Sequence, residues 1–127
     1  MKRGNQRKFG RTRKVRTALK KSLSTALIDH GRIKTTAAKA KTLASTLDQL
    51  VTLARRGTLN SRRELLSQIG EKAAKKLVDE ISKAASGRKG GYTRITRLGQ
   101  RRSDGAEMAV IELVERVPMP QAPLESK

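Results

Sequence analysis

The stretch TAAKAKTLASTLDQLVTLARR, residues 36–56, carries the strongest periodic signal in this chain. Its apolar residues recur every three or four positions, as they do on one face of a helix. They are Ala40, Leu43, Ala44, Leu47, Leu50, Val51 and Ala54. Thr35 or Thr36 can cap the start of this helix, and Gly57 can end it. We therefore expect a long amphipathic helix over about residues 36–56.

Three shorter helices are predicted around this segment. The first begins near residue 13 and ends at Gly31, which is well placed as the residue just past a helix end. The next opens with a capping box formed by Ser61 and Glu64. The last runs from about residue 71 to residue 85. Apolar side chains recur at helical spacing in all three.

Strands are predicted where this period changes. Residues 33–35 form a short β-prone step, and two longer strands span 92–98 and 108–114. An Asp-Gly pair at residues 104–105 marks the turn between the longer strands. The strand at 108–114 is apolar on both faces, which suits an interior strand. The predicted order is helix, strand, three helices and two strands.

The ends of the chain differ from this patterned part. Residues 1–12 are basic and lack helical or strand period, so they are predicted to form an extended arm. A single globular domain is expected over 13–116, and residues 117–127 read as a loose tail containing three prolines.

Charge points to a polyanionic partner. The formal net charge is +19 on 127 residues, and residues 1–28 hold ten lysines and arginines and no acid. Such density repels itself until phosphate groups neutralise it. No stretch is apolar enough to span a membrane, and the absence of cysteine excludes disulfides and cysteinyl metal sites. We expect a cytoplasmic protein with no membrane partner.

Catalysis is not expected. The chain has one histidine, no cysteine and scattered acids, and these form no recognisable catalytic or metal-binding set. His30 lies at a predicted helix end, where a histidine commonly caps carbonyl groups or meets phosphate. We therefore predict no catalytic residue, metal, cofactor or small-molecule substrate.

Three basic surfaces are candidates for nucleic-acid binding. The first comprises Arg3, Arg7, Lys8, Arg11, Arg13, Lys14, Arg16, Lys20 and Lys21. The second, at the start of the long helix, comprises Arg32, Lys34, Thr35, Thr36, Lys39 and Lys41. The third comprises Arg88, Lys89, Gly90, Gly91, Tyr92, Arg94, Arg97, Arg101 and Arg102. Helix amino termini and paired glycines both allow close approach to phosphate.

Each surface also has a plainer interpretation. The arm can be a solvated tail, the two threonines can serve only as helix caps, and the glycine-rich segment can be only a turn. Tyr92 is either a base-stacking residue or a half-buried strand tyrosine. Because the chain has only Phe9 and Tyr92 as aromatics, it cannot build a base-stacking platform. The protein must therefore recognise the sugar-phosphate backbone and the shape of a nucleic acid, which is typical of proteins embedded in folded RNA.

Several sequence blocks resemble the bacterial large-subunit ribosomal protein seventeen family. They are LIDHGRIKTT at 27–36, KAK at 39–41, GGYTRI at 90–95 and MAVIELV at 108–114. The resemblance extends from about Lys8 to Val114, with all blocks in order.

This resemblance implies an α/β (α+β) fold with two layers, in which the helices pack on one side of a small mixed sheet. It also implies a structural protein that binds large-subunit ribosomal RNA near the rim of the peptide exit tunnel, beside neighbouring large-subunit proteins and without a cofactor. The family's basic arm, threonine pair and glycine-tyrosine turn correspond to residues within the three surfaces above.

Two other functions remain open at this stage. Composition permits a histone-like protein that compacts DNA, which copurification with large subunits would distinguish. An enzyme of RNA metabolism would require an acidic pair to converge in the fold.

Overall fold

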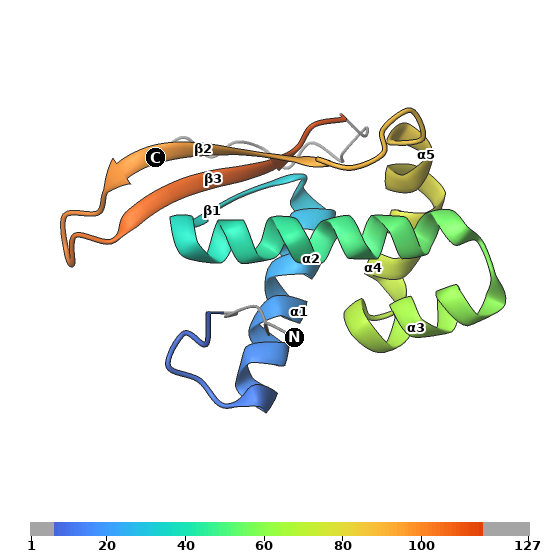
Figure 1. Cartoon of the computed structure of the whole chain (residues 1–127), viewed down its shortest axis with the longest axis horizontal. Coiled ribbons are helices and arrows are strands. Elements are labelled where there is room, and N and C mark those ends of the chain that lie inside the picture. Colours follow the sequence, from blue (N-terminus) through green and yellow to red (C-terminus); the bar gives the residue numbers. More distant parts are fainter. Residues whose placement is uncertain (1–6, 116–127) are drawn as a thin grey trace, which may run out of the picture.

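Two layers, one of helices and one of strands, make up the computed structural model, which describes residues 7–115 (Figure 1). Its elements are α1 (Arg13–His30), β1 (Arg32–Thr36), α2 (Ala37–Arg56), α3 (Leu59–Ile69), α4 (Glu71–Lys76), the π-helical turn η1 (Leu77–Ile81), α5 (Ser82–Ala84), β2 (Thr93–Gln100) and β3 (Glu107–Leu113). The predicted fold class and element order are confirmed. Arg3 and the predicted tail lie outside the described residues.

The long helix α2 is the centre of the fold. Its side chains at Leu43, Leu47, Leu50 and Val51 are at most 2% exposed, and α2 packs against all three strands and against α1 and α3. The Thr36 hydroxyl caps its start by accepting a hydrogen bond of 3.4 Å from the Lys39 backbone N–H. The predicted stripe is therefore the face that holds the two layers together.

The sheet has the order β1-β3-β2 and is antiparallel throughout, not mixed as the family resemblance implied. The tight turn after β2 reverses the chain, so β3 must run against β2. On its other edge β3 pairs with β1, with Ile33 opposite Ile111. The predicted interior position of this strand is confirmed, because Ala109 and Ile111 are fully buried.

Two predicted helix details are corrected. α3 begins before Ser61, and Thr58 is its cap, accepting a hydrogen bond of 3.1 Å from the Ser61 backbone N–H. Ser61 itself is buried inside the helix. The single helix expected over 71–85 is interrupted by η1, which separates α4 from α5.

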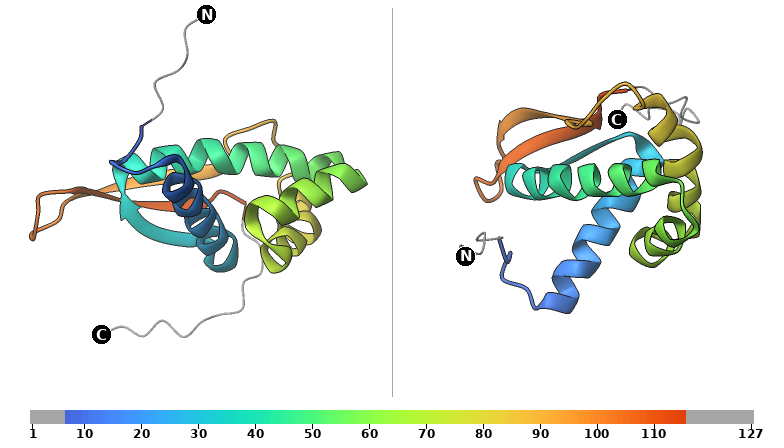
Figure 2. Two further views of the ribbon diagram at one scale, coloured as in Figure 1. Left: turned by 90° about the horizontal axis from the view of Figure 1, so that it is seen from below. Right: turned by 45° about the vertical axis from the view of Figure 1, so that its right-hand side comes forward.

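The helices are spread unevenly under the sheet. α1 crosses α2 at a steep angle, while α3, η1 and α5 pack against α2 toward its carboxyl end (Figure 2). The β2–β3 hairpin extends the other way, beyond the amino end of α2 (Figure 1). None of the described helices is long and apolar enough to cross a membrane.

Candidate nucleic-acid interface

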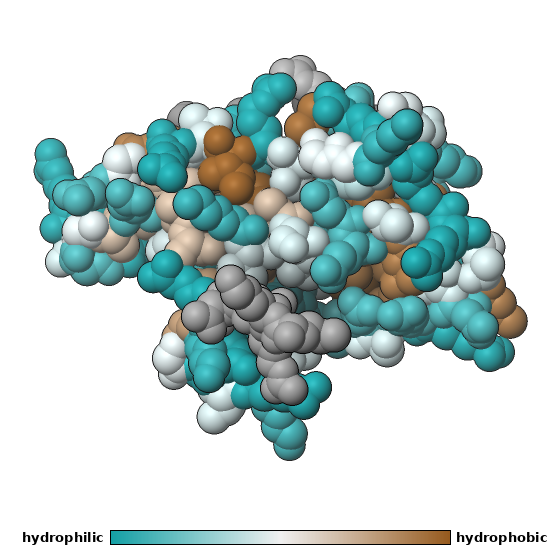
Figure 3. Space-filling view, viewed as in Figure 1, coloured by the Kyte–Doolittle hydropathy of each residue, from teal (hydrophilic) through white to brown (hydrophobic). Residues whose placement is uncertain are grey.

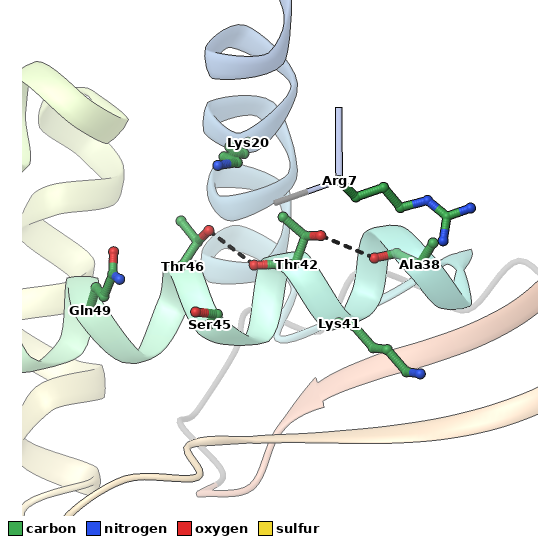
Figure 4. Close-up of a pocket in the computed structure, with 8 residues that line it drawn as sticks. All are labelled: Arg7, Lys20, Ala38, Lys41, Thr42, Ser45, Thr46 and Gln49. Atoms are coloured by element: carbon green, nitrogen blue, oxygen red, sulfur yellow. Dashed lines mark hydrogen bonds between the residues drawn. The ribbon is translucent and has the colours of Figure 1, made fainter. Parts of the chain in front are cut away.

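The described part of the arm turns rather than running straight. Phe9 and Gly10 both have positive φ, and the Arg11 backbone N–H donates to the Lys8 carbonyl at 3.1 Å. The guanidinium of Arg7 lies 5.9 Å from the centre of the Phe9 ring, a cation–π distance. This turn brings Arg7 beside the start of α2 (Figure 4).

Arg7, Lys20 and Lys41 border one hollow of about 370 Å³, which we call the α2 hollow (Figure 4). They come from the arm, α1 and α2, so the fold joins parts of the first and second predicted surfaces. The remaining lining residues are Ala38, Thr42, Ser45, Thr46 and Gln49, all on α2. Because no carboxylate lines the hollow, its field favours an anion.

A second hollow of about 270 Å³ lies between α1, α2 and α3. It shares Lys20, Thr46 and Gln49 with the α2 hollow. Ser24 also lines it; this side chain is 1% exposed, and its Oγ has no hydrogen-bond partner among the described residues. The shared lining makes the two hollows neighbours along α1 and α2.

The remaining residues of the second predicted surface differ in exposure and in role. Thr36 serves as the helix cap, so the interpretation of this threonine as a cap is confirmed. Thr35 and Lys39 are half-buried, whereas Arg32 and Lys34 are exposed on β1, an edge strand.

The third predicted surface is divided between the two ends of β2 (Figure 1). Its glycine-rich turn lies near the carboxyl end of α2, where Arg55 anchors it. The Arg55 guanidinium donates to the Tyr92 hydroxyl at 2.8 Å, to the Arg88 carbonyl at 2.5 Å and to the Ser86 carbonyl at 3.2 Å. Tyr92 is only 3% exposed, so its side chain belongs to the core and is not available to stack on a base.

Sequence reasoning missed Arg55 and Arg56 as site residues. With Thr52 and Lys89 they line a hollow of about 390 Å³ beside the turn. The sequence contains the signal that could have identified them, because this basic pair ends the helix with the strongest periodic pattern.

Three predicted cations have carboxylate partners. Arg88 pairs with Glu115 at 2.8 Å and Arg94 with Glu112 at 3.9 Å. At the hairpin tip Arg101 pairs with Asp104 at 2.6 Å. The hydrogen bond from Arg101, with help from the Ala106 backbone N–H, lowers the pKa of Asp104 to about 2 and raises that of Arg101. These pairs lower the positive charge available to a ligand.

The other predicted cations form a dispersed exposed set. Within residues 7–115 they make no ion pair: Lys8, Arg11, Arg13, Lys14, Lys21, Arg32, Lys34, Lys89, Arg97 and Arg102. Arg16 is half-buried and donates to the Arg11 carbonyl at 2.9 Å, which braces the arm against α1. Gly90 and Gly91 are exposed in the turn. Hydrophilic side chains cover the hairpin tip, and a paler band runs over α2 (Figure 3).

Acidic residues within the described part of the chain do not gather into a metal site. Among residues 7–115 there is no group of three or more histidine, aspartate or glutamate side chains placed to hold a metal ion.

Comparison with known proteins gives a consistent result. A family model described as ribosomal protein L17 matches residues 19–114. The large ribosomal subunit protein bL17 of Clostridium acetobutylicum is 46% identical over 109 residues, covering 85% of this chain and 96% of the relative. The large ribosomal subunit protein bL17 of Methylacidiphilum infernorum is 46% identical, covering 94% of this chain and 89% of the relative. The bL17 protein of Chloroflexus aggregans is 48% identical, covering 84% of this chain and 92% of the relative.

Proposed function

Because the chain belongs to the ribosomal protein L17 family, we propose that it is built into the large ribosomal subunit by binding large-subunit ribosomal RNA. The family consists of ribosomal proteins, so the chain is a structural component and not an enzyme. The observation that carries the proposal is the α2 hollow, where cations from three segments meet without a carboxylate.

Phosphate neutralisation explains this arrangement. Each Lys or Arg that meets a phosphate releases a counterion, which contributes favourable entropy to binding. Cations of the arm, α1 and α2 border one hollow, and further cations lie on the distant hairpin tip, so one protein can contact more than one RNA segment. The burial of Tyr92 leaves the described surface without a base-stacking platform, which supports recognition through backbone and shape.

The family resemblance supports the finer parts of this proposal. It favours a position near the rim of the peptide exit tunnel, contact with neighbouring large-subunit proteins, and a cytoplasmic, ribosome-bound location.

A density-gradient profile of the tagged protein tests the function. We expect comigration with the large subunit, retained in moderate salt and lost together with the RNA after ribonuclease treatment. Sedimentation with nucleoid DNA instead would favour the histone-like alternative, and a profile restricted to free protein would overturn the proposal.

The basic contacts are tested by RNA titration at several salt concentrations. Lys20→Ala with Lys41→Ala should weaken binding to large-subunit rRNA and flatten the logarithmic salt slope by up to about two units. Arg88→Ala is the matched control, because Glu115 already neutralises this cation. Equal effects of the two changes would contradict the assignment of the α2 hollow.

A further inference from the structure

The hydroxyl groups in the α2 hollow are restricted in what they can bind. The Thr42 hydroxyl donates to the Ala38 carbonyl at 3.2 Å, and the Thr46 hydroxyl donates to the Thr42 carbonyl at 3.0 Å (Figure 4). A hydroxyl has one proton and two lone pairs, so both oxygens remain only as acceptors. An unprotonated phosphate oxygen cannot donate a hydrogen bond, so these hydroxyls favour a different group of the ligand.

The cations at the border supply the phosphate contacts instead. Lys20 and Lys41 are donors without acceptor capacity, and Arg7 presents a planar guanidinium. The floor between them is built from small side chains, including Ala38 and Ser45. A backbone whose phosphates lie on these cations can therefore bring its sugars close to the helix surface.

The neighbouring hollow contains a buried polar atom without a hydrogen-bond partner among the described residues. Ser24 is buried and its Oγ has no partner among residues 7–115, although it lines a hollow that shares Lys20 with the first. A buried hydroxyl without a partner loses free energy that a bound polar group can restore. The hollow that Ser24 lines reaches α3, where Ser67, Gln68 and Ile69 form part of its lining.

We infer that the α2 hollow recognises the ribose face of an RNA backbone, with Thr42 and Thr46 accepting hydrogen bonds from 2′-hydroxyl groups while the bordering cations hold the adjacent phosphates. The 2′-hydroxyl is a donor that DNA lacks, and A-form helices display it across a wide, shallow minor groove. The inference rests on the proposed function and adds to it a site that distinguishes RNA from DNA.

Interference mapping tests this assignment. Large-subunit rRNA transcripts carrying scattered 2′-deoxy substitutions are bound to the full-length protein, and the bound fraction is sequenced. A separate pool carries phosphorothioate substitutions. We expect 2′-deoxy substitution at a few positions to reduce binding by about two- to tenfold, the range of one hydrogen bond. Thr42→Val with Thr46→Val should abolish this interference at those positions and leave the neighbouring phosphorothioate interference in place.

Ser82→Ala is the control. Ser82 lies on α5 and lines neither the α2 hollow nor the neighbouring hollow, and its hydroxyl makes the same kind of bond, donating to the Val78 carbonyl at 2.7 Å. This change should leave the interference at those positions unchanged. Valine is β-branched like threonine, so circular dichroism should show helices intact in all variants.

The outcomes separate the two proposals. Binding with unchanged 2′-deoxy interference in the Thr42 and Thr46 variant overturns the inference but not the proposed function. Binding that is equal for RNA and for fully 2′-deoxy DNA of the same sequence also overturns it. Failure of the unmodified protein to bind the rRNA overturns both.

Discussion

The two ends of β2 are both basic in sequence but are held in different ways. At the start of the strand Tyr92 is buried, and its backbone N–H donates to the Asp48 carboxylate at 3.3 Å while Arg55 binds its hydroxyl. At the far end the hairpin tip projects beyond the helices (Figure 1), and there Arg101 forms an ion pair with Asp104, three residues away in the same turn.

This difference shows that arginines clustered in a sequence can have different roles, one stabilising the fold and another remaining exposed for a ligand. Near Tyr92 a guanidinium binds protein carbonyls and ties a turn to the helical layer. At the tip the Arg101 guanidinium pairs with Asp104 inside its own turn. The neighbouring Arg102 is exposed and can contact a partner. We expect the anchored end to affect the free energy of unfolding and the tip to affect ligand binding.

The largest expected effect is loss of the tyrosine anchor. Tyr92→Ala should lower the free energy of unfolding by about 3–5 kcal/mol, because it leaves a cavity and removes the hydroxyl that Arg55 binds. Leu98→Ala near the tip should change it by no more than about 0.5 kcal/mol, since Leu98 is 50% exposed. Urea denaturation measures both, and similar losses would contradict the comparison.

The second-largest effect on the free energy of unfolding is expected from changing the Arg55 guanidinium. Arg55→Lys keeps the charge but cannot reach three acceptors with a planar fork, so we expect a loss of about 1–2 kcal/mol. Arg56→Lys is the control, because Arg56 is exposed and its side chain makes no hydrogen bond or ion pair within residues 7–115. If thermal denaturation shows no difference between them, the anchor is not held by Arg55.

Glycine substitutions compare the two ends at equal local strain. Gly91 and Gly105 have φ of 62° and 70°, and the left-handed conformation costs an alanine roughly 1–2 kcal/mol. Gly91→Ala should lower the melting temperature, whereas Gly105→Ala should mainly speed amide exchange at the tip. Gly90→Ala, which lacks positive φ, is the control and should do neither. A lower melting temperature in Gly105→Ala would show that the tip is coupled to the core.

The smallest effect concerns pH at the tip. The pKa of Asp104 is lowered from 3.8 to about 2, so its pairing with Arg101 stabilises the turn above pH 4 and is lost as pH falls through about 2. Amide exchange of Ala106, whose N–H donates to Asp104 at 3.1 Å, should rise over that interval. Asp104→Asn should remove this dependence. A change confined to higher pH would point to another group.

Local patterns predicted most of the fold because their causes are local. The stripe of α2 and the Asp-Gly turn follow from backbone geometry within a few residues. The cap of α3 was misplaced because Thr58 and Ser61 both suit a cap and only the path of the chain before them selects Thr58. The antiparallel direction of β1 was missed because its partner β3 is distant in sequence.

By itself, the sequence determined the position of the long helix α2, the positive charge and the family, since periodicity, composition and residue order need no knowledge of distances. Only the tertiary structure decided which cations pair with a carboxylate and which remain exposed to solvent. The crossing of α1 over α2 brings Arg7, Lys20 and Lys41 around one hollow, and packing of the turn on α2 buries Tyr92 against Arg55. Burial and electrostatic pairing depend on separations of a few ångströms, which residues distant in sequence reach only in the folded chain.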